Sequence, residues 1–339
     1  MKLIVQIPCL NEEETLPHTL AELPRDLPGL DRIEWLVIDD GSSDRTVEVA
    51  REHGVDHVVR LTNNKGLAAA FQAGLDASLK LGADVIVNTD GDNQYRGSDI
   101  AKLVAPVLAG KADMVVGNRQ VDRIEHFSGP KKLLQRLGSW VVRRASGTDV
   151  PDTTSGFRAY NREAALQLLV VSNFTYTLES LIQAGRMLIA VDHVEIGTNP
   201  KLRESRLFGS SGAYVRRIGP EILRVWARYE PFRAFSVAAL VVGLLALAAW
   251  TPFVVDWILN GDSSGHIQSL ILGAVLFIAA LQLFALGVIG DLLAGQRVMT
   301  QRVFERVRRV ELQLGVEPSH YEAGAGQDEP PARVERISA

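Results

Sequence analysis

Residues 35–53 read WLVIDDGSSDRTVEVAREH and contain one complete unit of the fold: an apolar run, an acidic turn and a helical pattern. The run at 35–39 is dominated by large apolar side chains, which is typical of a strand buried on both faces of a sheet. Asp44 precedes the helical pattern at 45–53 and is suited to cap its first turn. The stretch therefore predicts a strand and a helix joined by an acidic turn.

The same unit recurs along the first 120 residues. Short apolar runs with the composition of strands occupy residues 3–7, 35–39, 57–61, 84–88 and 114–117. Helical patterns lie between them at residues 13–23, 45–53, 66–81 and 99–108. This alternation predicts an α/β fold with a mainly parallel sheet and helices on both faces. Because ligands bind beyond the carboxyl ends of the strands in such sheets, we expect the chemistry in the turns that follow them.

Three of these turns carry acidic residues. The first strand ends in PCLNEE (residues 8–13), the second in DDGSSD (39–44) and the fourth in DGDNQ (90–94). Asp90 and Asp92 are hard oxygen ligands two residues apart, which suits a divalent cation that also binds phosphate oxygens. Gly91 between them permits close backbone approach to a ligand. A lone D-x-D is more often an ordinary acidic turn, but the neighbouring acidic strand ends favour a metal site.

The second acidic turn contains two acids with different predicted roles. We expect Asp40 to bind the nucleobase or ribose of a nucleotide, as acids after the second strand do in nucleotide-binding sheets. The alternative is that this turn only caps the following helix, a role that we assign to Asp44.

Composition excludes several classes of protein. The 339 residues contain 36 Lys and Arg against 40 Asp and Glu, a net charge of −4, which argues against a surface built for nucleic acid. The single cysteine, Cys9, excludes an internal disulfide and is predicted to be an inert core residue. Neither G-x-G-x-x-G nor G-x-x-x-x-G-K-[ST] follows a predicted strand, which disfavours a dinucleotide-binding fold and a P-loop.

Two uncharged apolar stretches, residues 234–255 and 267–290, predict a transmembrane hairpin. At about 1.5 Å per residue, each is long enough to cross a hydrocarbon core of about 30 Å. The alternative is a pair of buried helices in a soluble core. The loop at 256–266 has no Lys or Arg, whereas basic residues flank the other ends: Arg224, Arg228, Arg233, Arg297, Arg302, Arg306, Arg308 and Arg309. The positive-inside rule then places the first domain and both termini in the cytosol.

These patterns predict three segments. Residues 1–223 form the cytosolic α/β domain, and residues 224–310 contain a juxtamembrane helix, the hairpin and a basic cytosolic helix. Residues 311–339 are polar and rich in Pro and Gly, and we expect them to be a disordered tail.

The motifs together resemble those of a known family. IPCLNEEETL (7–16), VIDDGSSDRT (37–46), NNKGLAAAFQAG (63–74), NTDGDNQ (88–94), VGNR (116–119) and DTTSGFRAY (152–160) stand in the order seen in family 2 glycosyltransferases of the GT-A fold. More narrowly, the chain resembles the dolichyl-phosphate mannose synthase group, which transfers sugars to polyprenyl phosphates and includes members with a two-helix membrane hairpin. Two departures are DGD where members often have DAD, and Arg203-Glu204-Ser205-Arg206 where G-E-S-K is usual.

The resemblance implies inverting transfer of a sugar from a nucleotide-diphosphate sugar to dolichyl or undecaprenyl phosphate, with Mg²⁺ or Mn²⁺ as cofactor. The residues implied for the donor are Pro8, Leu10, Asn11, Glu12, Asp39, Asp40, Lys65, Asp90 and Gly91. Those implied for the metal are Asp90, Asp92 and Gln94. Those expected on the acceptor phosphate are Arg119, Arg136, Ser155, Arg158, Arg203 and Arg206. The catalytic set is Asp92, Asp152 and Arg119.

The charge of the acceptor decides which of these groups matter most. A phosphate monoester is largely a dianion at neutral pH, since its second pKa is about 6. It therefore needs little help from a general base such as Asp152, but it is repelled by the donor diphosphate. Arginines relieve that repulsion because they are always charged and bind phosphate in a bidentate manner. The alternative for each arginine is a solvated surface residue.

Other readings of the chain remain open. A processive polysaccharide synthase shares the fold, but it usually carries Q-x-x-R-W and more membrane spans, and neither is present. A non-catalytic membrane scaffold could retain the fold without the chemistry. Membrane lipids are expected partners of the hairpin and the basic segments beside it, and a homo-oligomer is possible.

Overall fold

The computed structural model describes residues 1–120, 142–144, 146–170, 176–200, 224, 227, 229–261 and 266–324. The chain divides into two compact units: Met1–Tyr214 together with Gln301–Ala339, and Val215–Thr300. The end of the second apolar helix and the segment after it therefore belong with the first unit. The predicted boundaries at residues 223 and 310 differ from this division.

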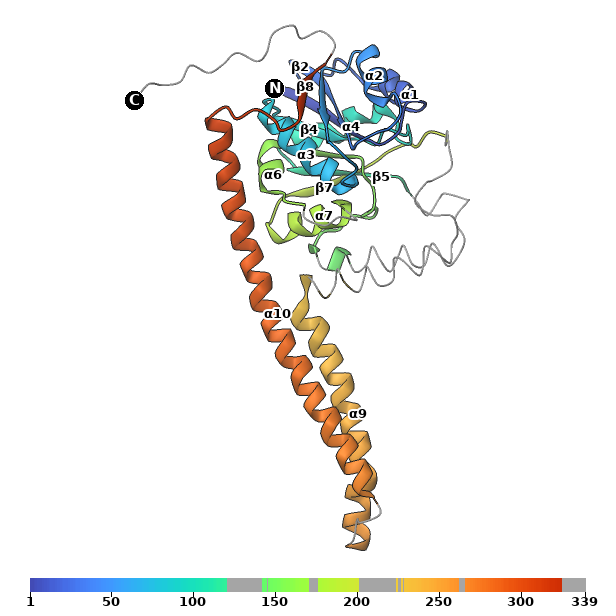
Figure 1. The fold of residues 1–339 in the computed structure, drawn as a ribbon, viewed down its shortest axis with the longest axis vertical. Coiled ribbons are helices and arrows are strands. Elements are labelled where there is room, and N and C mark those ends of the chain that lie inside the picture. Colours follow the sequence, from blue (N-terminus) through green and yellow to red (C-terminus); the bar gives the residue numbers. More distant parts are fainter. Residues whose placement is uncertain are drawn as a thin grey trace, which may run out of the picture. The chain divides into compact units, whose positions relative to one another are not determined.

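The first unit is built on one sheet of eight strands in the order β7-β5-β6-β4-β1-β2-β3-β8 (Figure 1). The strands are β1 Lys2–Cys9, β2 Arg32–Asp39, β3 His57–Arg60, β4 Val85–Asn88, β5 Met114–Asn118, β6 Arg158–Asn161, β7 Val191–Glu195 and β8 Tyr321–Ala323. The helices of this unit are α1 Leu16–Glu22, α2 Thr46–Glu52, α3 Leu67–Lys80, the short 3-10 helix η1 Gly97–Asp99, α4 Ile100–Leu108, α6 Arg162–Gln167 and α7 Tyr176–Arg186.

The predicted mainly parallel sheet is confirmed. β1 pairs in parallel with β2 and β4, and β2 pairs in parallel with β3, so four neighbouring strands end at one rim. β6 enters antiparallel between β4 and β5, and β8 pairs antiparallel with β3. The turns after β1, β2 and β4 therefore meet at the rim where the sequence placed the acidic motifs.

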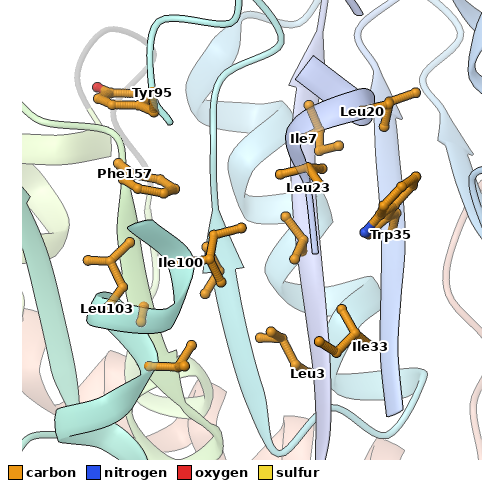
Figure 2. Packing of buried hydrophobic residues seen from close by; sticks show 14 of the residues in the cluster. Leu3, Ile7, Leu20, Leu23, Ile33, Trp35, Tyr95, Ile100, Leu103 and Phe157 are labelled. Carbon is orange, nitrogen blue, oxygen red and sulfur yellow. The ribbon is translucent and has the colours of Figure 1, made fainter. Parts of the chain in front are cut away.

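The sheet is covered on both faces, as alternating side chains on a strand require. Leu3 and Ile7 of β1 pack with Leu20 of α1 and with Ile100 and Leu103 of α4 in one buried cluster (Figure 2). On the other face, Gly74 of α3 lies so close to Gln6 and Ile38 that an added Cβ would come within 2.7 Å of the Gln6 Oε1 atom.

The predicted disordered tail is wrong for residues up to 324. The second apolar helix continues to Gln313, and Tyr321–Ala323 forms β8 on the edge of the sheet. The prediction failed because a strand of three residues has no periodicity of its own, and its stability comes from the edge with which it pairs.

The end of this helix is held by a buried arginine. Arg308 is 3 % exposed, and its Nη1 donates to the carbonyl oxygens of Ala165 and Leu168 at 3.0 Å, at the end of α6. Arg309 pairs with Glu163 in α6. These two arginines, which the sequence predicts on the cytosolic side of the membrane, bind the end of the helix to the α/β unit.

The second unit contains α9 Pro231–Asn260 and the first part of α10 Ile267–Gln313. Both are long and apolar enough to cross a membrane, with mean hydropathies of 2.2 and 2.5 in their most apolar windows. Only 11 % and 17 % of those windows are buried, which does not fit core helices of a soluble protein.

Small residues bring the two helices together. An added Cβ on Gly273 would lie 2.1 Å from the Trp250 ring, and one on Gly287 would lie 3.2 Å from Phe235. Trp250 also donates its Nε1–H to the Leu270 carbonyl at 3.1 Å. Close packing over small residues is typical of membrane helix pairs.

Candidate active site

The turns after β1 and β2 are joined by hydrogen bonds. Asn11 has a left-handed φ of 54°, its backbone N–H donates to Ser42 Oγ at 2.9 Å, and its side-chain oxygen accepts from the Ser43 N–H at 2.8 Å. The Glu12 N–H donates to Thr46 Oγ1 at 2.8 Å. Pro8, Leu10, Asn11 and Glu12 therefore lie beside the acidic turn of β2, and their role in binding the donor stays a prediction.

The acids of the β2 turn have structural partners. Asp40 accepts the backbone N–H groups of Lys65 at 2.7 Å and Gly66 at 2.9 Å, directly before α3. Burial raises the pKa of Asp40 and outweighs these two hydrogen bonds. Asp39 accepts the Ser42 N–H at 2.9 Å. Asp40 and Lys65 thus hold a loop together, which the sequence did not predict, although each carboxylate oxygen has capacity for a further donor.

Asp44 binds the start of α2 as predicted, but from the position before the N-cap residue, which is Arg45. Its Oδ1 accepts the Thr46 N–H at 3.0 Å, at the first residue of α2, and its Oδ2 accepts the Glu13 N–H at 3.1 Å. Hydrogen bonds to Thr46 and Glu13 outweigh burial and lower the pKa of Asp44.

The turn after β4 is packed against the end of β1. An added Cβ on Gly91 would lie 3.0 Å from Cys9 Sγ, and the Gly91 carbonyl accepts from Thr19 Oγ1 at 3.1 Å. Cys9 is buried, and burial raises the pKa of its thiol, as expected for an inert core cysteine. Asp92 Oδ1 accepts the Gln94 N–H at 3.1 Å, so the acid and the following residue share one tight turn.

Asp90, in the turn after β4, lies against the loop that precedes β6. An added Cβ on Gly156 would lie 3.2 Å from both carboxylate oxygens of Asp90. Gly156 is held by two buried side chains: its N–H donates to Tyr95 Oη at 3.0 Å, and its carbonyl accepts from Asn88 Nδ2 at 2.8 Å. The Tyr95 ring stacks on Phe157 with centroids 4.9 Å apart (Figure 2).

The two aspartates of the DGD motif fit a divalent cation. Burial, and then the charge of Asp92, raise the pKa of Asp90 to about 7, and the positive charge of Arg119 offsets this only in part. Both side chains are partly exposed. Within the described residues no group of three or more His, Cys, Asp and Glu is placed to hold a metal. A cation here would complete its shell with water and phosphate oxygens, as Mg²⁺ commonly does.

Arg119 is the arginine that the structure brings to the site. Its Nε donates to Asp152 Oδ2 at 2.7 Å and its Nη2 to Asp152 Oδ1 at 3.0 Å, a bidentate pair. Nη2 also donates to Thr154 Oγ1 at 2.9 Å. Burial acts to raise the pKa of Asp152, but Arg119 outweighs it, so the pKa is lowered. Sequence reasoning missed Thr154, whose only signal is its position two residues after Asp152.

The structure corrects two predicted acceptor ligands. Arg158 is fully buried, and its guanidinium donates to the carbonyls of Ser155, Thr177 and Thr153 at 2.7, 2.7 and 2.9 Å. Ser155 is also fully buried, and its Oγ accepts the Phe157 N–H at 3.4 Å. Both side chains therefore support the loop behind Asp90 instead of facing an acceptor. Arg136, Arg203 and Arg206 lie outside the described residues.

Known proteins are similar to this chain in sequence. Residues 4–169 match the family described as glycosyl transferase family 2. The undecaprenyl-phosphate mannosyltransferase of Micrococcus luteus is 29 % identical over 250 residues, which are 69 % of this chain and 98 % of the relative. The polyprenol monophosphomannose synthase of Mycolicibacterium smegmatis is 33 % identical over 167 residues, 47 % of this chain and 62 % of the relative.

A solved structure resembles the first unit. Glucosyl-3-phosphoglycerate synthase from Mycobacterium tuberculosis, in complex with Mn²⁺, UDP-glucose and phosphoglyceric acid, aligns with a TM-score of 0.52 and 25 % identity. The alignment covers 66 % of this chain and 79 % of the solved chain.

Proposed function

The chain belongs to glycosyltransferase family 2 and is a glycosyltransferase, and we propose that it transfers a sugar from a nucleotide-diphosphate sugar to the phosphate of a polyprenyl lipid. Two relatives named for that acceptor class support the proposal, one of them along 98 % of its length. The observation in this chain that carries it is the meeting of Asp90 and Asp92 with the bidentate Arg119–Asp152 pair near one rim of the sheet.

In this proposal, the donor binds over the hydrogen-bonded turns after β1 and β2, and its diphosphate faces Asp90 and Asp92. These two aspartates would hold Mg²⁺ or Mn²⁺, which would supply positive charge to the leaving nucleoside diphosphate. The relative solved with Mn²⁺ and UDP-glucose supports a divalent ion and a nucleotide sugar in this fold.

Arg119 is positioned to receive the acceptor phosphate. Asp152 and Thr154 engage its Nε and Nη2, and within the described residues Nη1 has no hydrogen-bond partner. A guanidinium locked on one edge presents its other edge to an anion with little loss of conformational entropy. Since both Asp152 oxygens accept hydrogen bonds from Arg119, we assign Asp152 to positioning Arg119 and not to general-base catalysis.

The attack proceeds in the proposal as a single displacement. An oxygen of the lipid phosphate forms the new bond to the anomeric carbon, the bond from that carbon to the donor diphosphate breaks, and the configuration inverts. The acceptor is already a dianion, so no residue has to remove a proton from it.

The apolar helices α9 and α10 support a reaction at a membrane, where a polyprenyl acceptor resides. The absence of Lys and Arg from residues 256–266, against arginines at the other ends of the hairpin, favours the cytosolic face.

A donor screen tests the function. Membranes that contain the full-length chain are given undecaprenyl or dolichyl phosphate and one radiolabelled donor at a time: GDP-mannose, UDP-glucose or UDP-N-acetylglucosamine. We expect one donor to label an organic-extractable lipid, and Asp92→Asn membranes to show no label. Label in no lipid, or only in a polymer, would overturn the proposal.

A further inference from the structure

The strand β8 lies at one edge of the sheet, beside β3 (Figure 1). It pairs with β3 in the register Val59 with Tyr321 and His57 with Ala323. Two backbone bonds extend the pairing beyond its ends: Arg60 N–H to the His320 carbonyl at 2.9 Å, and Gly324 N–H to the Asp56 carbonyl at 3.0 Å. A segment from the far end of the chain is thereby fixed in the α/β unit.

Side chains fasten the strand as well. The buried His57 ring contacts Glu34 Oε2 through Nε2 at 2.7 Å and the Tyr321 hydroxyl through Nδ1 at 2.9 Å. Glu322 forms an ion pair with Arg51 of α2. Residues of β3, β2 and α2 therefore hold β8 in place together. Backbone pairing over three residues alone would supply fewer contacts.

This strand forms one wall of a cavity of about 520 Å³. The size lies within the range of about 300–1,000 Å³ that is typical of small-molecule sites. The other walls come from the turn after β2 and the end of β3, and the lining residues that matter here are Gly41, Ser42, Arg60, Thr62, His320 and Tyr321.

The cavity is continuous in structure with the donor turns. Gly41 and Ser42 directly follow Asp39 and Asp40, and Ser42 is bonded both to Asp39 and to the Asn11 N–H. Arg60, at the end of β3, lies with its Nε 3.5 Å from Asp39 Oδ2. The cavity therefore opens at the carboxyl ends of β2 and β3, on the rim that also carries Asp90.

The lining suits a flat heterocycle. Arg60 offers a planar group on which a base can stack, while Thr62 and His320 offer hydrogen-bonding groups for its edge. His320 has a left-handed φ of 57°, a backbone conformation that is uncommon for residues other than glycine.

We propose that residues 320–322 form the outer wall of the nucleobase end of the donor site, and that His320 is a specificity-determining residue for the base. This inference rests on the proposed function, because it requires that the donor is a nucleotide sugar. It gives the segment that follows the membrane hairpin a direct role in donor recognition.

The test compares two neighbouring substitutions in the full-length, detergent-solubilised protein: His320→Ala, which removes a lining side chain, and Ser319→Ala, an exposed control outside the lining. Isothermal titration calorimetry in the presence of Mn²⁺ measures binding of GDP, UDP and inorganic diphosphate. We expect His320→Ala to weaken the preferred nucleotide by about fivefold to tenfold, equivalent to about 1–1.4 kcal/mol, with diphosphate unchanged and Ser319→Ala like the wild type.

A second variant addresses the strand as a whole. An added side chain at Gly324 would meet the Val55 carbonyl at 2.0 Å, so Gly324→Val should displace the end of β8 and weaken nucleotide binding in the same selective way.

The outcomes separate the two claims. If the wild type transfers sugar but His320→Ala binds GDP and UDP with wild-type affinity, the inference fails and the proposed function stands. Equal weakening of nucleotide and diphosphate would also overturn it, because a contact with the base cannot act on diphosphate. If the wild type binds neither nucleotide and labels no lipid, the proposed function itself fails.

Discussion

Asp92 and Asp152 are both acids near the rim of the sheet, but they differ in exposure and in hydrogen-bond partners. Asp92 is partly exposed in the DGD turn, whereas both oxygens of Asp152 are bonded to Arg119. We expect Asp92→Asn to lower kcat by about 10²–10³-fold, the range for losing one group that stabilises transition-state charge. Asp152→Asn should cost about tenfold and act mainly on the KM for the lipid phosphate, because it weakens the positioning of Arg119.

Steady-state kinetics with a soluble short-chain polyprenyl phosphate measure both effects. An equal loss of kcat in the two variants would contradict the view that the acceptor dianion needs no base. Thr154→Ala, which removes one contact to Arg119 Nη2, serves as the mild control.

The pKa of Asp90 predicts a pH dependence of metal binding. Because burial and the charge of Asp92 raise this pKa to about 7, the carboxyl is mostly protonated below pH 7 and must lose its proton to bind a cation. The apparent affinity for Mn²⁺ should rise between pH 6 and pH 8, with the steeper change below pH 7. Titration of free Mn²⁺ by electron paramagnetic resonance measures it, and a flat profile for the wild type, equal to that of Asp90→Asn, would refute the expectation.

At the scale of single residues, the sequence predicted positions better than hydrogen-bond partners. Asp90 and Asp92 follow β4 as predicted, and Arg119 follows β5, whereas Asp152 lies in the loop before β6, a strand that the sequence did not predict. The buried role of Arg158 was not predictable, because its partners are backbone carbonyls whose positions exist only after folding.

At the scale of elements, the end of α10 shows how a helix from the apolar hairpin joins the α/β unit. Arg308 donates to two carbonyls at the end of α6 and lies 3.8 Å from Asp76. Arg306, two residues earlier in the same helix, is exposed. The two residues form a matched pair, because replacing either by Ala removes the same side chain with the same change in helix propensity.

We expect Arg308→Ala to lower the melting temperature and Arg306→Ala to leave it within about 1 °C. The loss from Arg308→Ala should be about 1–3 kcal/mol, since buried carbonyl groups lose their donor, and this corresponds to several degrees for a domain of this size. Differential scanning fluorimetry in detergent measures both. Equal melting temperatures would mean that the end of α10 contributes nothing to the stability of the unit.

Helices and strands whose hydrophobic residues recur with a regular period were predictable from the sequence. Those without such a period were not. The alternation at residues 3–117 predicted β1 to β5 and the helices between them to within a few residues. The antiparallel direction of β6 and the existence of β8 depend on which strand edge is available, and no local pattern encodes that.

At the scale of the whole molecule, each of the two units contains a different part of what the proposed reaction requires. The α/β unit carries the acidic rim and Arg119, and the apolar helices provide the length and composition to reach a lipid acceptor. The apolar runs were predictable because hydrophobicity over more than 18 residues is a strong local signal. The return of the chain to the α/β unit after Thr300 was not, since packing between distant segments leaves no such signal.

The central claim is that Asp90 and Asp92 hold a cation without which sugar does not reach the lipid. The most direct measurement is synthesis of labelled polyprenyl-phosphate sugar by membranes treated with EDTA and then given Mg²⁺ or Mn²⁺, for the wild type and for Asp92→Asn. The account predicts that chelation abolishes synthesis, that one of the two ions restores it in the wild type, and that neither restores it in the variant. Undiminished synthesis after complete chelation, or wild-type synthesis by Asp92→Asn, would contradict it.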